Sequence, residues 1–542
     1  MSADTKAAGT NNLGSPTLAQ QVALDSRPAG SNKWAIAVAV AIGALLEIID
    51  TSIVNVALTS MQASLGATLS QVGWVVTSYA IANVIILPLS AWLGDRFGKK
   101  RYFLFSLVGF TAASVLCGLS TNLTMLVIAR ILQGLTGGGL LAKAQAILFE
   151  TFPKEEQAMA QGFFGAIVIA GPAIGPTLGG YIVTNIDWRW IFFINLPIGI
   201  LAVFLTIWAL PADDPSKRQK LPVDWLAIGL LAVGIGALQT FLEEGNADDW
   251  FESSFITTLA IAAVVSLTWF VVRTLKSEAP VVHLRVLRYR SLWAGSILSV
   301  AVGISLYGAL FSVPIFAQQI LGFTSQQTGM LLLPGALTSA FAMPIAAKLN
   351  QRVGDPRATL VFGGLVLITA LFMFSRLNPQ TSSSELQLPL IVRALGTVFM
   401  FLPLQLAALA PVPKKDVGAA TGLFNLTRQL GGSIGVAILT TMLEKRTAFH
   451  HAVLSEHLVS SDPRTIERVT LYTRALIAKG MDANAAHSAA LKLLDGSVRA
   501  QAAVISFGDT FFATAVLILV SLPLVLLLSR PRPGASVAAG AH

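Results

Sequence analysis

Two acidic residues, Glu47 and Asp50, interrupt an apolar stretch at residues 34–59. Because they are three positions apart, they share one face if that stretch is a helix. An ionisable side chain in the middle of a membrane costs about 3 kcal/mol or more, so such residues usually serve a function. A carboxyl group in apolar surroundings also holds its proton more tightly and can exchange it near neutral pH. We therefore predict that Asp50 and Glu47 take part in proton coupling.

A positive charge, Arg130, lies in a second apolar stretch at residues 123–149 and is followed by Gln133 and Gly134. A fixed guanidinium group displaces a proton from a nearby carboxyl group when the distance between them changes. We predict that Arg130 belongs to the same proton-coupling group, and a purely structural ion pair is the alternative. Lys143, further along, is long enough to extend toward the cytoplasmic surface.

A short polar segment at residues 94–101 combines glycines, one acid and several bases. Glycine permits a tight turn, and the acid between two glycines can pair with a helix end or a donor across the turn. A cluster that only stops membrane insertion would explain the Lys and Arg residues but not the Asp. We predict that Gly94, Asp95, Arg96 and Gly98 form a functional turn on the cytoplasmic side.

Glycine and proline recur in the apolar segment at residues 171–180. Glycines four positions apart let two helices approach closely, and proline kinks a helix. We predict a bent, hinge-like interface that sets alternating access; a bent packing helix is the simpler alternative. The residues of this motif are Gly171, Gly175, Pro176, Gly179 and Gly180.

The C-terminal part of the chain contains related features. Arg393 and Arg428 are further charges in apolar stretches, and each either bonds to a helix end or serves transport. Arg428 begins a motif that continues with Gly431 and Gly432. Helix and depth alone select five candidates for a substrate cavity, namely Asn55, Tyr79, Gln133, Tyr307 and Phe311.

The composition places these residues in a membrane protein. Of 542 residues, 54% are hydrophobic and only 12% are charged, whereas a soluble domain has about 25% charged residues. Apolar stretches recur at the ~20-residue length that spans a bilayer, and they are too long and uniform for barrel strands. One cysteine excludes an internal disulfide, and no metal-ligand spacing is present. The net charge of +9 follows the loops, so it indicates topology rather than nucleic-acid binding.

We predict an all-α integral membrane protein with fourteen transmembrane helices and cytoplasmic N and C termini. Lys and Arg cluster in the short loops after even-numbered helices, as the positive-inside rule requires of cytoplasmic loops. The loop at about 444–507 has eight Lys or Arg; we place it outside, as amphipathic helices such as 465–479 and 483–494. The predicted spans lie near 34–59, 71–93, 103–120, 123–149, 161–184, 191–210, 224–243, 254–273, 292–319, 327–348, 359–376, 386–410, 417–443 and 508–529.

An internal repeat divides the chain. Residues 92–98 and 348–354 share Leu, Arg and Gly at the same spacing, and Arg130 has a counterpart in Arg393. Two six-helix halves around a central site are typical of transporters. The predicted domains are a disordered cytoplasmic tail at 1–33, a six-helix half at 34–210, two inserted helices with their flanking loops at 211–290, a second half at 291–530 that includes the outer loop 444–507, and a cytoplasmic tail at 531–542.

These motifs resemble those of the major facilitator superfamily. The loop after the second helix, the arginine of the fourth helix and the glycine-rich fifth helix resemble three of its signatures. Segments at residues 50–57, 188–199 and 428–435 resemble its fourteen-helix drug:proton antiporters. The long outer loop is most similar to the EmrB type of multidrug efflux permease, and the resemblance covers about residues 34–530.

The resemblance implies a multi-pass protein of the inner (plasma) membrane that exports amphipathic compounds in exchange for protons. It implies that Asp50 and Arg130 couple transport to protons. It also implies that the turn with Gly94, Asp95, Arg96 and Gly98 is a cytoplasmic gate and that the helix at residues 171–180 carries the antiporter motif. It also implies a periplasmic adaptor and an outer-membrane channel as partners, and no cofactor, because the proton gradient drives transport. Ala91 stands where the loop motif usually has glycine, and Glu47 lies outside the family pattern.

We therefore expect a proton-coupled antiporter that exports amphipathic drugs or toxic compounds from the cytoplasm or inner leaflet by alternating access. An exporter of one metabolite or organic acid on the same scaffold is the nearest alternative. A non-transporting sensor or scaffold is an alternative of another class, but it would not need Asp50 and Arg130 within the membrane. We expect no enzyme, because the predicted helices contain no pairing of a nucleophile with a base.

Overall fold

The computed structural model describes residues 32–214, 222–378, 380–456, 458 and 461–529. Every regular element in those ranges is helical, which confirms the all-α class. The long elements are α2 (Lys33–Leu65), α3 (Leu69–Phe97), α4 (Lys99–Gly118), α5 (Leu123–Gly137), α6 (Leu140–Thr151), α7 (Lys154–Asn185), α9 (Asn195–Ala209), α10 (Trp225–Glu244), α11 (Ser254–Lys276), α12 (Arg290–Ile315), α13 (Ser325–Val353), α14 (Pro356–Phe374), α15 (Ser383–Leu409), α16 (Val417–Glu456), α17 (Pro463–Ala478) and α18 (Ala483–Ser521). Short ones are α8 (Trp190–Phe193), η2 (Trp250–Glu252), η3 (Leu284–Arg288), η4 (Phe316–Ile320), η5 (Lys414–Asp416) and η6 (Leu522–Leu527).

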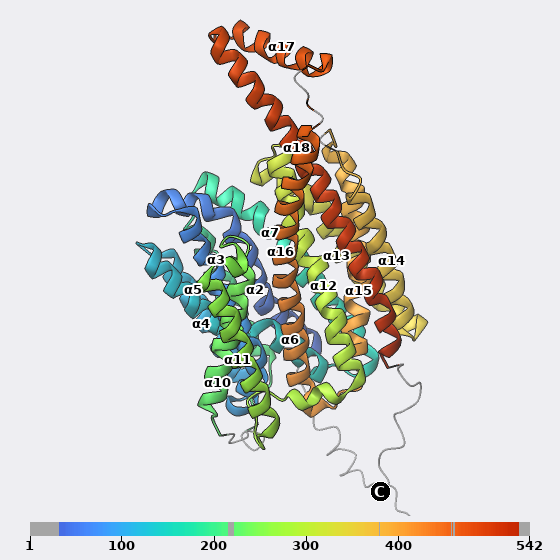
Figure 1. Cartoon of the computed structure of the whole chain (residues 1–542). Helices are drawn as coiled ribbons and strands as arrows, with labels where there is room; N and C mark the ends of the chain where they lie inside the picture. Colours follow the sequence, from blue (N-terminus) through green and yellow to red (C-terminus); the bar gives the residue numbers. More distant parts are fainter. Residues whose placement is uncertain (1–31, 215–221, 379, 457, 459–460, 530–542) are drawn as a thin grey trace, which may run out of the picture.

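Twelve spans in the described part of the chain are long and apolar enough to cross a membrane. Two further helices, α7 with 32 residues and α16 with 40, are not among those twelve. Both lie within the bundle, since α7 packs on α2 and α13 and α16 packs on α12 (Figure 1). The total of fourteen crossings therefore stays a prediction, and so does the location of the termini, because residues 1–31 and 530–542 lie outside the described ranges.

The same helix pairs pack together in the two segments that the sequence predicts to be repeats. In the first segment α2 packs on α7, α3 on α5, and α4 on α9. In the second segment α12 packs on α16, α13 on α15, and α14 on α18. Corresponding helices of the two segments therefore have corresponding packing partners.

The local signals at the ends of α3 and α13 also match. Each helix begins with a capping box, in which Thr68 and Gln71, or Thr324 and Gln327, exchange bonds between side chain and backbone. Such a box satisfies backbone N–H groups that the first turn of a helix leaves free. The two helices thus start in register with each other across the repeat.

The predicted fourth span is broken in the structure. The helix ends at Gly137 as α5 and restarts at Leu140 as α6. At Gly138 a Cβ atom would lie 2.5 Å from the Asn83 carbonyl oxygen and 2.8 Å from its Cα, so only glycine allows α3 to come this close. The break therefore results from close backbone packing, and it frees backbone N–H groups at the start of α6.

The inserted pair α10 and α11 packs at the side of the bundle, with α10 lying along both α3 and α16 (Figure 1). Two hydrogen bonds fix its outer end to α16. Gln239 donates to the Ser433 hydroxyl (2.7 Å), and the Trp250 indole donates to the Thr441 hydroxyl (3.1 Å). The insertion thus covers the line where a helix of the first segment meets a helix of the second.

The outer segment is helical, as predicted, but it is not a separate loop. Helices α16 and α18 continue beyond the bundle, and α17 lies across the end of α18 (Figure 1). A small apolar cluster joins the tip, with Val469 of α17 packed on Ala490 and Leu494 of α18. Helices α16, α17 and α18 therefore form a projection at one end of the molecule, which we call the outer projection after its predicted side.

Candidate functional site

A buried ion pair joins α2 and α5. The Arg130 guanidinium donates from Nη1 to Asp50 Oδ2 at 2.5 Å, and both side chains are almost completely buried. Asp50 Oδ1 accepts two further bonds, from the side-chain amides of Gln133 and Asn195, each at 2.9 Å. This carboxylate is therefore held by one cation and two neutral donors, which offsets much of the cost of burying its charge.

Arg130 is fixed on several sides. Its Nε donates to the Val75 carbonyl of α3 (2.9 Å), and its Nη1 also donates to Gln133 Oε1 (2.7 Å). The guanidinium carbon lies 4.1 Å from the centre of the Tyr79 ring, a cation–π distance. Arg130 is thus bonded to α3, the helix that leads to the predicted gate.

Asn195 is a member of this cluster that the sequence reasoning missed. It lies at the start of α9, donates to Asp50, and also donates to the Ser114 hydroxyl of α4 (3.0 Å). Its amide oxygen is buried and has no hydrogen-bond partner among the described residues. The sequence signal that was available is a single amide side chain in an apolar stretch, within the segment at residues 188–199 that resembles an antiporter motif.

Glu47 occupies a separate polar site one turn from Asp50. Its Oε1 accepts from the Asn83 side-chain amide (2.8 Å), and its Oε2 accepts from the Leu141 backbone N–H (3.0 Å). That N–H is free because the chain breaks between α5 and α6. The start of a helix attracts negative charge, so the break creates the site that holds this carboxylate.

The predicted gate residues lie at the junction of α3 and α4. Gly94 and Gly98 are buried, while Asp95 and Arg96 are half-buried. Lys143 of α6 lies directly against Gly94, where a Cβ atom would overlap its ammonium group. The Lys143 side chain extends toward the predicted cytoplasmic side, but it does not reach the surface, because it is 3% exposed and packs into this junction.

Asp213 completes the junction and was not predicted. Its carboxylate accepts from the backbone N–H groups of Lys100 and Arg101, each at 2.9 Å, and so caps the start of α4. Lys100 in turn donates to the Leu210 carbonyl at the end of α9. A Cβ atom at Gly98, whose φ is +98°, would overlap Asp213, so the residue must be glycine for two reasons.

Three glycines of the predicted motif in α7 lie against α2, the helix that carries both acids. A Cβ atom at Gly171 would lie 2.5 Å from the Ile48 side chain, and one at Gly175 would lie 2.7 Å from Ser52 Cβ. At Gly179 the Ile53 side chain would be 2.6 Å away. Gly180 differs, because its nearest neighbour, Gln326 of α13, would be 3.8 Å away; Pro176 is half-buried.

The C-terminal motif packs α16 on α12. A Cβ atom at Gly431 would lie 2.7 Å from Val300 Cα, and one at Gly432 would lie 2.5 Å from the Tyr307 ring. Arg428 is buried, donates from Nη2 to Asn425 (2.5 Å), and has its guanidinium carbon 5.0 Å from the centre of an aromatic ring of α15. Its Nη1 is buried and has no hydrogen-bond partner among the described residues.

The five cavity candidates are not gathered in one place. Tyr79 and Gln133 belong to the charged cluster around Arg130. Tyr307 is half-buried, and its ring packs against a glycine of α16. Asn55 is exposed on α2, and Phe311 is half-buried on α12.

In the described ranges, three hydrogen bonds from one side chain to another connect the first six-helix segment to the second. The Asn425 amide donates to Gln145 (2.6 Å), and the Gln405 amide donates to Gln161 (2.9 Å). A third bond runs from Gln429 to Asn83 Oδ1 (3.3 Å), and the same Asn83 amide bonds to Glu47. Each donor-acceptor pair is neutral, so each bond is modest in strength and can be exchanged for water.

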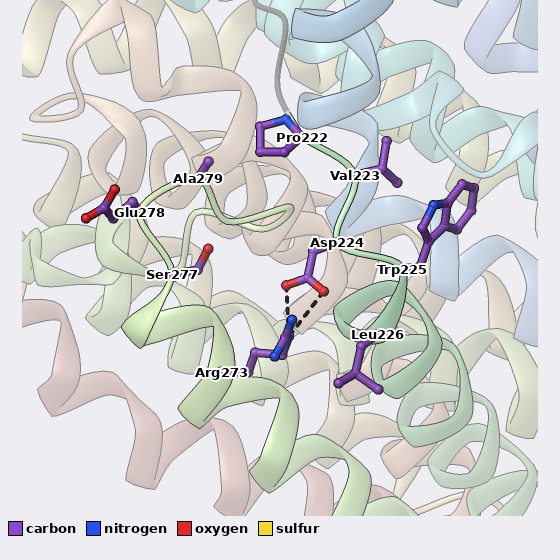
Figure 2. Close-up of a pocket in the computed structure, with 9 residues that line it drawn as sticks. All are labelled: Pro222, Val223, Asp224, Trp225, Leu226, Arg273, Ser277, Glu278 and Ala279. Atoms are coloured by element: carbon purple, nitrogen blue, oxygen red, sulfur yellow. Dashed lines mark hydrogen bonds and ion pairs between the residues drawn. The ribbon is translucent and has the colours of Figure 1, made fainter.

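An open hollow lies apart from these charges, at the end of α10 and α11 (Figure 2). It encloses about 690 Å³ and contains the ion pair of Asp224 with Arg273, whose shortest contact is 2.9 Å. The hydrogen bond from Arg273 lowers the pKa of the Asp224 carboxyl group. Asp224 also caps α10 by accepting from Ala227 N–H (3.0 Å), so this pair has a structural role.

Metal chemistry has no candidate in the described ranges, where no three His, Cys, Asp or Glu side chains gather closely enough to hold an ion. His450 and His451 bond instead to single carboxylates, Asp509 and Asp495, each at 2.8 Å. These contacts join α16 to α18 within the outer projection.

The chain resembles known transport proteins over most of its length. A family model described as the Major Facilitator Superfamily matches residues 40–436. The multidrug export protein EmrB of Escherichia coli is 31% identical over 515 residues, which cover 95% of this chain and 98% of that protein. The fatty acid resistance protein FarB of Neisseria gonorrhoeae is 31% identical over 497 residues, covering 92% and 96%. The EmrB protein of Haemophilus influenzae is 33% identical over 429 residues, covering 79% and 84%.

A solved structure has the same fold. The human organic anion transporter MFSD10 (TETRAN) matches with a TM-score of 0.53 and 14% sequence identity, and the match covers 90% of this chain and 100% of that chain. At this identity the likeness concerns the arrangement of helices alone.

Proposed function

This chain belongs to the major facilitator superfamily, and on that premise we propose that it is a proton-coupled antiporter that exports amphipathic compounds by alternating access. It is a transporter of the multidrug-efflux kind rather than an enzyme, and a multi-pass protein of the inner membrane. The proposal concerns the coupling of transport to protons, the residues that perform it, and the connection from those residues to the gate.

The observation that supports proton coupling is the ion pair of Asp50 with Arg130. A structural pair would be expensive here, because apolar residues of similar volume usually pack at least as stably as a buried ion pair. Asp50 has two amide partners as well as the arginine, and those amides still provide dipoles when the carboxyl group is protonated. The site can therefore hold either protonation state.

Protonation of Asp50 changes the force on α3. While Asp50 is ionised, its charge holds the Arg130 guanidinium in place. Once Asp50 is neutral, that attraction is lost, and Arg130 remains bonded to the Val75 carbonyl of α3. In our proposal the arginine then shifts with α3, whose far end carries the gate residues Gly94 to Gly98. An inward-moving proton thus drives the change of state that releases the compound outside.

Glu47 is proposed as a second proton-linked group. Through Asn83 it is connected to Gln429 in the second segment, so its charge affects a bond between the two segments. A neutral Glu47 holds the Asn83 amide less firmly, because a hydrogen bond to a charged acceptor is about twice as strong as one to a neutral acceptor. Protonation at this point would loosen the contact between the segments.

We also propose the six-plus-two-plus-six organisation, with halves at 34–210 and 291–530 and the insertion at 211–290. The repeated packing pairs and the matched capping boxes support it. The insertion moves with the second half in this proposal, because Gln239 and Trp250 both bond to α16.

The outer projection is proposed to bind a periplasmic adaptor that leads to an outer-membrane channel. Helix α17 lies outside the bundle, where lipid would not cover apolar side chains, and yet it exposes large ones. Leu471 is 65% exposed and Ile466 is 51% exposed. Exposed apolar groups gathered on a projecting helix indicate a protein-protein contact.

The test uses inverted membrane vesicles with an acidic interior. Addition of a transported amphipathic compound should release protons from the interior, and the Asp50→Asn variant should show no such release. Cells that carry the variant should lose resistance to the same compound. Undiminished proton release by Asp50→Asn would remove the coupling assignment, and no release for any compound in a broad panel would remove the antiport proposal.

A further inference from the structure

Arg428 has a polar environment that does not neutralise its charge. The side chain is 3% exposed, yet its hydrogen bond runs from Nη2 to the neutral amide oxygen of Asn425. Its second terminal nitrogen, Nη1, is buried without a hydrogen-bond partner among the described residues. A buried cation is strongly unfavourable unless it is paired, so this arrangement is costly to the closed protein.

The nearest candidate acid does not bond to it. Glu47, across the line between the two segments, has one oxygen bonded to Asn83 and the other to the Leu141 N–H. Arg428 therefore differs from Arg130, which is bonded directly to a carboxylate. Among the described residues, Arg130 has a carboxylate bonded to it, whereas Arg428 has none within ion-pair distance.

Arg428 lies on the side of α16 that faces the first segment, and the proposed transport path runs between the two segments. Residues 425, 428 and 429 share one helix face, because they are three and four positions apart. Asn425 bonds to Gln145 and Gln429 bonds to Asn83, and both acceptors belong to the first segment. Arg428 therefore lies on the face that meets the first segment, between two bonds that must break when the segments separate.

We propose that Arg428 is an anion-binding residue of the substrate path, and that it selects amphipathic acids whose head group is a carboxylate or a similar planar anion. A guanidinium group presents parallel N–H donors that match a carboxylate, and such pairs are shorter and stronger than neutral hydrogen bonds. The aromatic ring of Phe401, 5.0 Å from the guanidinium carbon, holds the plane of the group and adds an apolar surface for the substrate.

The proposal rests on the export function above and makes it more specific. When the segments separate, Nη1 becomes available, and a bound carboxylate supplies the missing charge. A neutral compound of the same shape gains the apolar contacts but not the ion pair. A cationic compound is repelled by Arg428. Charge selectivity is therefore the property that distinguishes this role from simple packing.

The experiment compares three probes with the same apolar body: para-hexylbenzoate, para-hexylbenzamide and para-hexylbenzylammonium. Binding to the full-length protein in lipid nanodiscs is measured at neutral pH. We expect the wild type to bind the benzoate about tenfold or more tightly than the benzamide, as for one charge-assisted pair. Arg428→Gln should bring the two affinities together while leaving the benzamide affinity unchanged.

Arg393→Gln is the matched control. Arg393 is also in a predicted span of the second segment and has a nitrogen without a partner, but it is half-buried. The control should retain the wild-type preference for benzoate. If Arg428→Gln does not fold, Arg428→Lys tests the proposal instead, because it keeps the positive charge but loses the planar guanidinium group with its parallel donors. This variant should retain a preference for benzoate that is several-fold smaller, and unchanged affinities for all three probes would overturn the proposal.

The remaining outcomes also distinguish an anion-binding role of Arg428 from a packing role. Equal wild-type affinities for the three probes, or a preference for the ammonium compound, would overturn the anion site while leaving export intact. An equal loss for all three probes in Arg428→Gln would assign Arg428 a packing role. If no probe binds the wild type, the anion site is overturned, whereas the export function fails only if no compound of a broad panel causes proton release in vesicles.

Discussion

At the scale of single residues, the structure separates two acids that the sequence treats as a pair. Asp50 bonds to Arg130, Gln133 and Asn195, whereas Glu47 bonds to Asn83 and a backbone N–H of α6. Their three-residue spacing places them on neighbouring parts of one helix, but the side chains enter different networks. One network lies inside the first segment, and the other reaches the second segment.

Removal of the Asp50 charge should have two separable effects. Asp50→Asn leaves Arg130 buried without its counter-ion, which we expect to cost about 3 kcal/mol of stability and to lower the melting temperature. The double variant Asp50→Asn/Arg130→Gln removes both charges and should recover most of that loss. Neither variant should show proton-driven export. Melting in detergent and proton release in vesicles measure the two effects, and export by the double variant at the wild-type rate would contradict the coupling role.

At the scale of elements, close helix contacts depend on particular glycines rather than on glycine content. In the motif of α7, Gly171, Gly175 and Gly179 lie against α2, whereas Gly180 does not. The break between α5 and α6 has a similar origin, because Gly138 lies against the backbone of α3. That break is also what supplies the N–H group bound by Glu47, so helix packing and site chemistry share one cause.

Two alanine substitutions in α7 test this distinction. Gly175→Ala would place a Cβ atom 2.7 Å from Ser52 Cβ and 3.0 Å from the Ile53 backbone nitrogen, so α2 and α7 must separate. Gly180→Ala meets nothing closer than 3.8 Å and is the control. We expect Gly175→Ala to lose about 1–3 kcal/mol of stability, as overpacked sites do, together with most export. Equal behaviour of the two variants, in melting and in resistance assays, would contradict the close-contact role.

The outer projection allows a comparable test on one helix. Leu471→Asp changes an apolar side chain of α17 that is 65% exposed, whereas Val469→Asp changes one that is 8% exposed and packed on α18. We expect Leu471→Asp to reduce recovery of a co-expressed adaptor without lowering the melting temperature. Val469→Asp should disturb the projection itself. Full adaptor recovery with both Leu471→Asp and Ile466→Asp would place the adaptor contact elsewhere.

At the scale of the whole molecule, the two segments are in contact on the side that the charge pattern assigns to the cytoplasm. The three bonds that connect the two segments involve α3, α6 and α7 on one side and α15 and α16 on the other. A further bond runs from the Gln351 amide of α13 to the Glu155 carbonyl of α7 (2.9 Å). In the proposed alternating-access cycle, every one of these bonds must break for the cytoplasmic side to open.

A reversible cross-link tests that requirement. Cysteines at the positions of Glu155 and Gln351 should form a disulfide that holds the cytoplasmic side closed and stops export, and reduction should restore it. The single natural cysteine, Cys117, is buried, so it should not interfere. Each single-cysteine variant is the control and should export with or without oxidant. Normal export by the fully cross-linked protein would show that these ends of α7 and α13 do not separate during transport.

The sequence by itself determined the helical class, the membrane location and the family, because these follow from apolar length, charge placement and local motifs that act over a few residues. It also identified Asp50, Arg130 and Glu47, since a charge in an apolar stretch is visible without a fold. The sequence also led us to expect the pairing of Asp50 with Arg130. The tertiary structure alone decided the amide and backbone partners. Asn195 is 145 positions from Asp50 and the Leu141 N–H is 94 positions from Glu47. Pairings over such distances are set by how helices pack, which no local pattern records, and the same reason hid the buried place of Lys143.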